Sequence, residues 1–135
     1  MSAAEPLAAV QQYIAAFNGG DEDAMSSMFA TDGVIVDGMA PHVWLGPSAA
    51  KDWYDDVLVE AERHGASNYV VALGEALHHD ITGDAAYLVM PATMQFSVKG
   101  TQITQTGAHF TVALRRLPAG WRIAAWAWTK GRQDR

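Results

Sequence analysis

The second half of the chain has the most constraining pattern, because from Tyr69 onward apolar residues follow the two-residue period of β-strands. Turn-forming residues interrupt this period at 82–84, 99–100 and 117–120. We therefore predict four strands, at approximately 69–81, 85–98, 101–116 and 121–129. The short connections predict antiparallel pairing, and strands this long in a small sheet must twist and curl.

The N-terminal part instead has the three- and four-residue spacing of amphipathic helices. The first predicted helix begins near Pro6, a residue that is tolerated in a first helical turn. Gly19-Gly20 ends it. Asp21 can cap a second, short helix, because its side-chain oxygen can accept hydrogen bonds from free amides of the first turn.

A strand and a third helix complete this first half. Thr31-Asp32-Gly33 predicts a turn before the strand Val34–Val36, which ends at Asp37. The third helix is predicted between Gly46-Pro47-Ser48 and His64-Gly65. Three helices that cover the concave side of a curled antiparallel sheet give an α+β half-barrel with an internal cavity. We expect one domain over residues 1–135.

The composition excludes several classes of protein. Half of the 135 residues are hydrophobic, which allows one core and an internal pocket. Nine basic residues against 15 acidic residues give a net charge of -6, without the basic cluster that a phosphate backbone needs. No stretch reaches the roughly 20 apolar residues that span a bilayer. The charge and the lack of such a stretch predict a protein that binds neither nucleic acid nor membranes. Because cysteine is absent, we also expect it to be cytoplasmic.

The sequence predicts no metal and no cofactor. His78 and His79 are neighbours in a predicted strand, so their side chains point to opposite faces and cannot easily share one ion. The chain has no phosphate loop, nucleophile elbow or dinucleotide fingerprint. Any chemistry must therefore rest on carboxylate, phenol and imidazole groups.

Two stretches of the sequence resemble members of one superfamily. The run Tyr13–Asp37, YIAAFNGGDEDAMSSMFATDGVIVD, resembles the N-terminal part of the ketosteroid isomerases. The run Val112–Trp128, VALRRLPAGWRIAAWAW, resembles the final hairpin of the SnoaL-like polyketide cyclases. Both groups belong to the nuclear transport factor 2-like superfamily. The resemblance implies a cone-shaped α+β half-barrel and a homodimer, but not one reaction, because this fold hosts several activities.

The resemblance also implies two catalytic residues. Asp37 lies where the isomerases have the carboxylate that moves a proton between carbons, and Tyr13 where they have the phenol that donates to the enolate oxygen. A carboxylate at a strand end can take a proton α to a carbonyl while a phenol stabilises the oxyanion. The chain departs from this pattern at Val112, which replaces a second, acidic oxyanion donor, and at Gly38, which replaces a common proline.

Each polar candidate also has a purely structural explanation. Asp37 could be a solvated carboxylate at a strand end, and Tyr13 a core tyrosine with its hydroxyl at the rim. His42 either crosses the mouth of the cavity or stays in an exposed loop. His109 shares a strand face with Thr111, and the strand register decides whether this face lines the cavity or lies outside, since a one-residue slip exchanges the faces.

Mainly apolar side chains are expected to form the wall of the cavity. The ligand-binding candidates are Phe17, Trp44, Trp53, Met94, Phe96, Thr111 and Trp126. Such a wall suits a small apolar or polycyclic carbonyl compound. Core packing or a dimer interface would explain these residues equally well.

We therefore expect a small-molecule-binding domain. If it is catalytic, Asp37 is the base and Tyr13 the oxyanion donor, with assistance from His109 or His42, in an isomerase, cyclase or lyase that needs no cofactor. One alternative is a non-catalytic ligand-binding or dimeric assembly module. Another is a hydrolase or dehydratase that holds a water molecule near Asp37 and His42.

Overall fold

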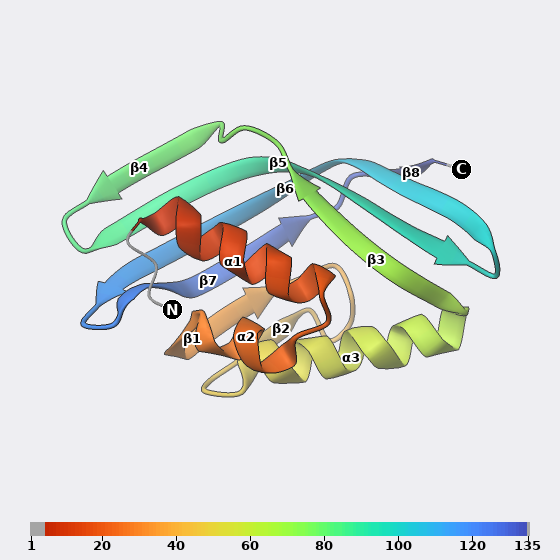
Figure 1. Ribbon diagram of the computed structural model, residues 1–135, viewed down its shortest axis with the longest axis horizontal. Helices are drawn as coiled ribbons and strands as arrows, with labels where there is room; N and C mark the ends of the chain where they lie inside the picture. The colour runs from red at the N-terminus through yellow and green to blue at the C-terminus, as the bar shows by residue number, and fades with distance from the viewer. Residues whose placement is uncertain (1–4, 135) are drawn as a thin grey trace.

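The computed structural model describes residues 5–134, which form three helices and one sheet of eight strands (Figure 1). In chain order the elements are α1 (Pro6–Asn18), α2 (Glu22–Ser27), β1 (Phe29–Val36), β2 (Val43–Leu45), α3 (Ala49–His64), β3 (Ala66–Leu73), β4 (His78–Thr82), β5 (Ala85–Val98), β6 (Thr101–Leu117), β7 (Gly120–Thr129) and β8 (Arg132–Asp134). The helices therefore precede the long strands, as the sequence predicts.

The sheet has the strand order β2-β1-β7-β6-β5-β3. β3 and β4 pair with different parts of β5, and β8 pairs with β6 near residues 104–106, beyond the segment that pairs with β7. The pairing of β1 with β7 is parallel, whereas the other pairs are antiparallel. The curled sheet with three helices confirms the predicted α+β half-barrel.

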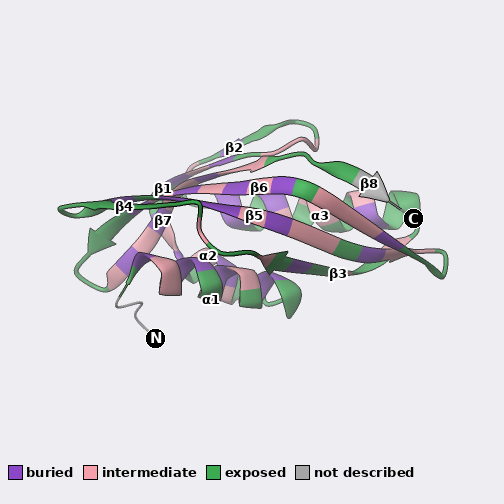
Figure 2. Cartoon of the chain, turned by 90° about the horizontal axis from the view of Figure 1, so that it is seen from above, coloured by how far each residue is buried: buried purple, intermediate pink, exposed green. Residues whose placement is uncertain are grey.

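The helices cover one face of the sheet. Figure 2 shows α1 and α2 on one side of the long strands. Inward-facing side chains of β6, such as Phe110, Val112 and Leu114, are almost fully buried. They alternate with half-buried residues, as expected for a sheet with one covered face. The core lies between this face and the apolar side of α1.

The predicted start of α1 and the predicted caps of α2 and α3 are confirmed. α1 begins at Pro6, and the Oδ1 atom of Asp21 accepts a hydrogen bond from the backbone N–H of Ala24 at 3.1 Å, capping α2. Gly65 caps the C-terminal end of α3, and its φ of 64° is the left-handed conformation that glycine adopts readily.

Two predicted strand boundaries are wrong. Residues 69–81 are not one strand, because β3 ends at Leu73 and β4 begins only at His78. Directly after β3, the backbone N–H of Gly74 donates to the Pro91 carbonyl of β5 at 2.7 Å. The predicted turn at 31–33 lies inside β1, where the register with β7 shifts between Phe29 and Val34. An irregular strand of this kind gives the same glycine signal as a turn.

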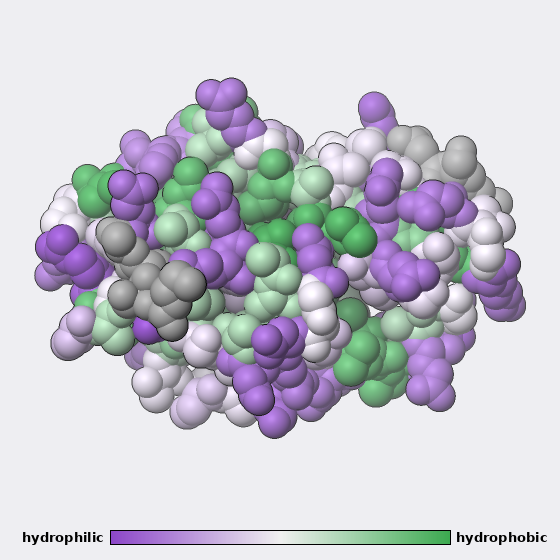
Figure 3. Space-filling model, in the orientation of Figure 1, coloured by the Kyte–Doolittle hydropathy of each residue, from purple (hydrophilic) through white to green (hydrophobic). Residues whose placement is uncertain are grey.

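The uncovered face of the sheet has an apolar surface. Val36, Val43, Leu45 and Tyr87 are all exposed and alternate with inward-facing neighbours. The homodimer implied by the resemblance would cover such a surface, and it stays a prediction. On the helix-bearing face, apolar side chains reach the surface near the centre and polar side chains surround them (Figure 3).

Candidate functional site

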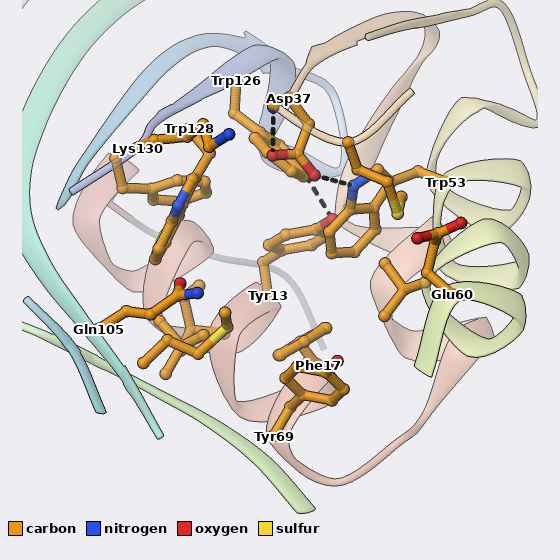
Figure 4. A pocket seen from close by; sticks show the side chains of 17 residues that line it. Tyr13, Phe17, Asp37, Trp53, Glu60, Tyr69, Gln105, Trp126, Trp128 and Lys130 are labelled. Carbon is orange, nitrogen blue, oxygen red and sulfur yellow. Dashed lines mark hydrogen bonds between the residues drawn. The ribbon is translucent and has the colours of Figure 1, made fainter. Parts of the chain in front are cut away.

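A cavity of about 200 Å³ lies between α1, α3 and the concave face of the sheet. Six predicted site residues line it: Tyr13, Phe17, Asp37, Trp53, Met94 and Trp126. They come from α1, the loop after β1, α3, β5 and β7, so distant parts of the sequence meet here (Figure 4). The wall is mainly apolar, as in most small-molecule sites.

Asp37 directs its carboxylate to this cavity from the first position after β1. The Trp53 indole N–H donates to its Oδ2 atom at 2.9 Å, and the backbone N–H of Gly38 donates to its Oδ1 atom at 2.7 Å. The backbone N–H of Asp37 donates to the His42 carbonyl at 3.0 Å. These bonds fix the side chain and the loop that carries it, so Asp37 is not a freely solvated strand end.

The surroundings of Asp37 make it a stronger base than an ordinary aspartate. Burial raises the pKa of Asp37 above its usual value, because a low-polarity environment disfavours the charged form. The hydrogen bonds from Trp53 and Gly38 oppose this rise without cancelling it. A carboxylate with a raised pKa in an apolar cavity has the properties of a general base.

Tyr13 lies deep in the same cavity, with its side chain 1% exposed. The Trp126 indole N–H donates to the Tyr13 hydroxyl oxygen at 3.0 Å, so the phenol proton remains able to donate to another acceptor. Burial raises the pKa of Tyr13, and the negative charge of nearby Asp37 raises it further. Tyr13 is therefore a neutral hydrogen-bond donor at all ordinary pH values.

Aromatic rings hold these two polar groups in place. Trp53 and Trp126 pack edge to face with ring centroids 4.9 Å apart, and Phe110 lies 5.2 Å from Trp126. Each indole donates its N–H to one of the two polar groups, Trp53 to Asp37 and Trp126 to Tyr13. Aromatic rings thus surround the two polar groups, Asp37 and Tyr13, that could react with a ligand.

The structure places His109 and Thr111 outside the cavity. Their neighbours Phe110 and Val112 are buried on the inner face of β6, and Phe110 lines the cavity. Successive side chains of a strand point to opposite faces, so His109 and Thr111 lie on the outer face. Val112, which the sequence resemblance places where the isomerases have a second oxyanion donor, is fully buried and apolar.

Three further candidates lie near the cavity but do not line it. His42 is exposed, with its Nδ1 atom 3.1 Å from the Asp37 backbone carbonyl rather than from the carboxylate. The Trp44 indole donates to Asp56 at 2.8 Å. Phe96 stacks on Tyr69 with ring centroids 5.0 Å apart, so it supports a cavity residue from behind.

Several lining residues were not selected from the sequence. They include Glu60, Tyr69, Gln105 and Lys130. Burial raises the pKa of Tyr69, and the nearby charge of Glu60 raises it further. The spacing of Glu60 from Trp53 on α3, two helical turns, is the one sequence signal that could have identified any of them.

Within residues 5–134, no group of three or more His, Asp and Glu side chains is arranged to hold a metal ion. None of the described helices combines the length and apolar character needed to cross a membrane.

Comparison with known proteins agrees with the fold. The family model of the SnoaL-like domain matches residues 7–127. The chain therefore belongs to the SnoaL-like family of the nuclear transport factor 2-like superfamily. No curated protein matches the sequence.

Solved structures share the fold at low sequence identity. An NTF2-like protein with a cystatin-like fold from Novosphingobium aromaticivorans is 23% identical, with TM-score 0.72 and coverage of 90% of this chain and 77% of that one. A ketosteroid isomerase-like protein from Erwinia carotovora atroseptica is 19% identical, with TM-score 0.70 and coverage of 93% and 92%. The hexachlorocyclohexane dehydrochlorinase LinA type 2 is 13% identical, with TM-score 0.77 and coverage of 95% and 86%.

Proposed function

We propose that the protein binds a compact apolar carbonyl compound in this cavity and transfers a proton at the carbon α to the carbonyl. The observation that carries this proposal is the pairing of Asp37 with Tyr13. One is a carboxylate whose pKa is raised by burial, and the other is a phenol that stays protonated, and both open on the same apolar space. This pairing provides a base and an oxyanion donor.

The reaction would proceed in two proton transfers. The Asp37 carboxylate takes a proton from the α-carbon, and the electron pair of the broken C–H bond forms the carbon–carbon double bond of an enolate. The carbonyl oxygen becomes the oxyanion and accepts a hydrogen bond from Tyr13. Protonated Asp37 then returns the proton to the same carbon or to a conjugated one. The second outcome is an isomerisation, and neither needs a cofactor.

The size of the cavity limits the ligand. A cavity of about 150 Å³ accommodates benzene. A volume of about 200 Å³ therefore suits a compound of one or two rings better than a four-ring steroid. The expected ligand is therefore a small aryl ketone or a similar compound rather than a polycyclic compound in general.

Elimination and hydrolysis are weaker candidates for this site. The name of the dehydrochlorinase LinA indicates loss of hydrogen chloride, a reaction that also requires removal of a proton, but the Tyr13 hydroxyl favours a substrate that develops charge on oxygen. Hydrolysis would need a water molecule held between Asp37 and His42. The His42 ring contacts the Asp37 backbone rather than its carboxylate, so the observed contacts give this reaction little support.

The test uses acetophenone and 2-acetylnaphthalene as probes. Binding is followed by quenching of tryptophan fluorescence, since three tryptophans line the cavity. Exchange of the methyl protons with D₂O is followed by proton NMR in the same samples. We expect both binding and exchange above the rate in buffer. Binding without exchange would replace the proposal with non-catalytic ligand binding, and absence of binding would contradict both.

Replacing Trp53 with phenylalanine should shift the pH dependence of exchange. The Trp53 hydrogen bond lowers the pKa of Asp37, so its loss should raise this pKa further. The rate should then reach half of its maximum at a higher pH than in the wild type, because the base must be ionised. Trp128→Phe is the matched control, as this cavity indole makes no described hydrogen bond to Asp37. An unchanged midpoint in Trp53→Phe would contradict the assigned role of Trp53.

A further inference from the structure

Lys130 is a cationic group of the cavity that proton transfer does not use. It follows β7 directly, is exposed to solvent, and lines the cavity together with Asp37 and Gly38. In Figure 4 its side chain lies across the cavity from Glu60. A side chain that is both exposed and part of the lining lies at the rim, where a ligand enters.

The alkyl chain of Lys130 is held against the backbone of Gly38. A Cβ atom added at Gly38 would lie 2.5 Å from Cδ and 2.8 Å from Cγ of Lys130. Glycine at this position therefore leaves the space that the lysine chain occupies. Lysine commonly packs its apolar stem in this way and keeps its ammonium group in water. The positive charge is thereby kept close to the opening of the cavity.

The acidic groups of the cavity already have partners. Asp37 accepts hydrogen bonds from Trp53 and Gly38. Glu60 forms ion pairs with Arg63 at 2.6 Å and with His64, when protonated, at 3.2 Å. None of the described ion pairs involves Lys130, and within residues 5–134 it is the only lysine or arginine that lines the cavity.

We propose that the natural ligand carries a carboxylate, which Lys130 binds at the rim while the apolar body of the ligand enters the cavity. This inference rests on the proposed function and narrows its substrate class to small aryl or alkyl ketones that bear an acid group. An ammonium group is a suitable partner for a carboxylate that remains partly in water. The chain has a net charge of -6 and therefore repels acidic ligands in general. A cation at the rim attracts such a ligand to the cavity.

The experiment compares 4-acetylbenzoate with methyl 4-acetylbenzoate, its uncharged ester. Affinities are measured by quenching of tryptophan fluorescence at low salt. The wild type should bind the acid about two- to fivefold more tightly than the ester, as expected for one exposed ion pair. Lys130→Gln should lose this preference with unchanged affinity for the ester, and Lys130→Arg should retain it. Lys99→Gln, at an exposed lysine outside the cavity lining, is the control.

A second variant tests the packing of the Lys130 side chain against Gly38. Gly38→Ala should displace Lys130 and reduce the preference for the acid while the lysine itself is kept. Equal affinities of the wild type for acid and ester, failure to bind the acid, or an equal loss for both probes in Lys130→Gln would overturn the inference. Deuterium exchange into the acetyl methyl group of the ester distinguishes failure of this inference from failure of the proposed function, because that exchange requires Asp37 and not Lys130.

Discussion

Replacing Asp37 with asparagine is expected to reduce exchange of the α-protons of a bound ketone by about 100- to 10,000-fold, the usual contribution of a general base. Asparagine has nearly the same shape and can still accept the Trp53 hydrogen bond, so affinity for the ketone should change little. The rate is measured by proton NMR in D₂O, and the affinity by tryptophan fluorescence.

Asp56→Asn is the matched control for this variant. Asp56 also accepts an indole hydrogen bond, from Trp44 at 2.8 Å, but lies outside the cavity lining. The control should exchange α-protons at the wild-type rate. Wild-type exchange in Asp37→Asn would mean that another group, or solvent alone, removes the proton.

The stability of the same variant relative to the wild type should increase with pH. The pKa of Asp37 is raised on folding, so the folded protein binds this proton more tightly than the unfolded chain. The wild type must therefore lose stability as the pH rises from the Asp37 pKa of the unfolded chain to that of the folded protein. At higher pH this loss of stability persists. Asparagine has no such loss. Thermal unfolding at acidic and neutral pH should show the stability difference growing with pH, and a difference that shrinks would contradict the raised pKa.

Replacing Tyr13 with phenylalanine is expected to slow exchange by about 100- to 1,000-fold, because it removes the hydrogen-bond donor to the oxyanion. The buried neighbour position Val112 is apolar and cannot donate a hydrogen bond to the oxyanion in place of Tyr13. Tyr54→Phe is the control, since this ring packs against Phe17 but does not line the cavity. A rate within a fewfold of the wild type would exclude Tyr13 as the oxyanion donor.

Tyr13→Phe should also destabilise the protein, by about 1–3 kcal/mol, since it leaves the buried Trp126 N–H without its acceptor. Trp126→Phe removes the donor instead. In the double variant no unpaired group remains, so its loss of stability should be smaller than the sum of the two single losses. Additive losses in chemical denaturation would contradict the described hydrogen bond.

The fold could be predicted because its signals are local and repeated. Alternation over the long segments that became β5 and β6 identified a curled sheet, and Pro6, Asp21 and Gly65 marked helix ends through backbone chemistry that acts within a few residues. The very short β2 and β8 carry too few residues to show a period. The position of Asp37 at a strand end could also be predicted, although its raised pKa depends on packing.

The composition of the cavity wall could be predicted only in part. A register shift in the pairing of β5 with β6, between Ala92 and Met94, faces the segment that contains Gly107. Alternation counted through such an irregularity cannot decide whether His109 or Phe110 faces inward. Lys130 reaches the cavity only because Gly38, far away in sequence, leaves room for its side chain. No local pattern reports such a contact.

The proposed reaction requires that Asp37 is the ionising group whose base form removes the proton. Its most direct test is a carbon-13 NMR titration of the Asp37 carboxyl group in the wild type, assigned with Asp37→Asn, next to the pH dependence of the exchange rate. We predict one shared midpoint, above the usual pKa of aspartate, with exchange increasing as the carboxyl ionises. A carboxyl that titrates at or below the usual value, or an exchange rate that follows a different midpoint, would contradict the claim.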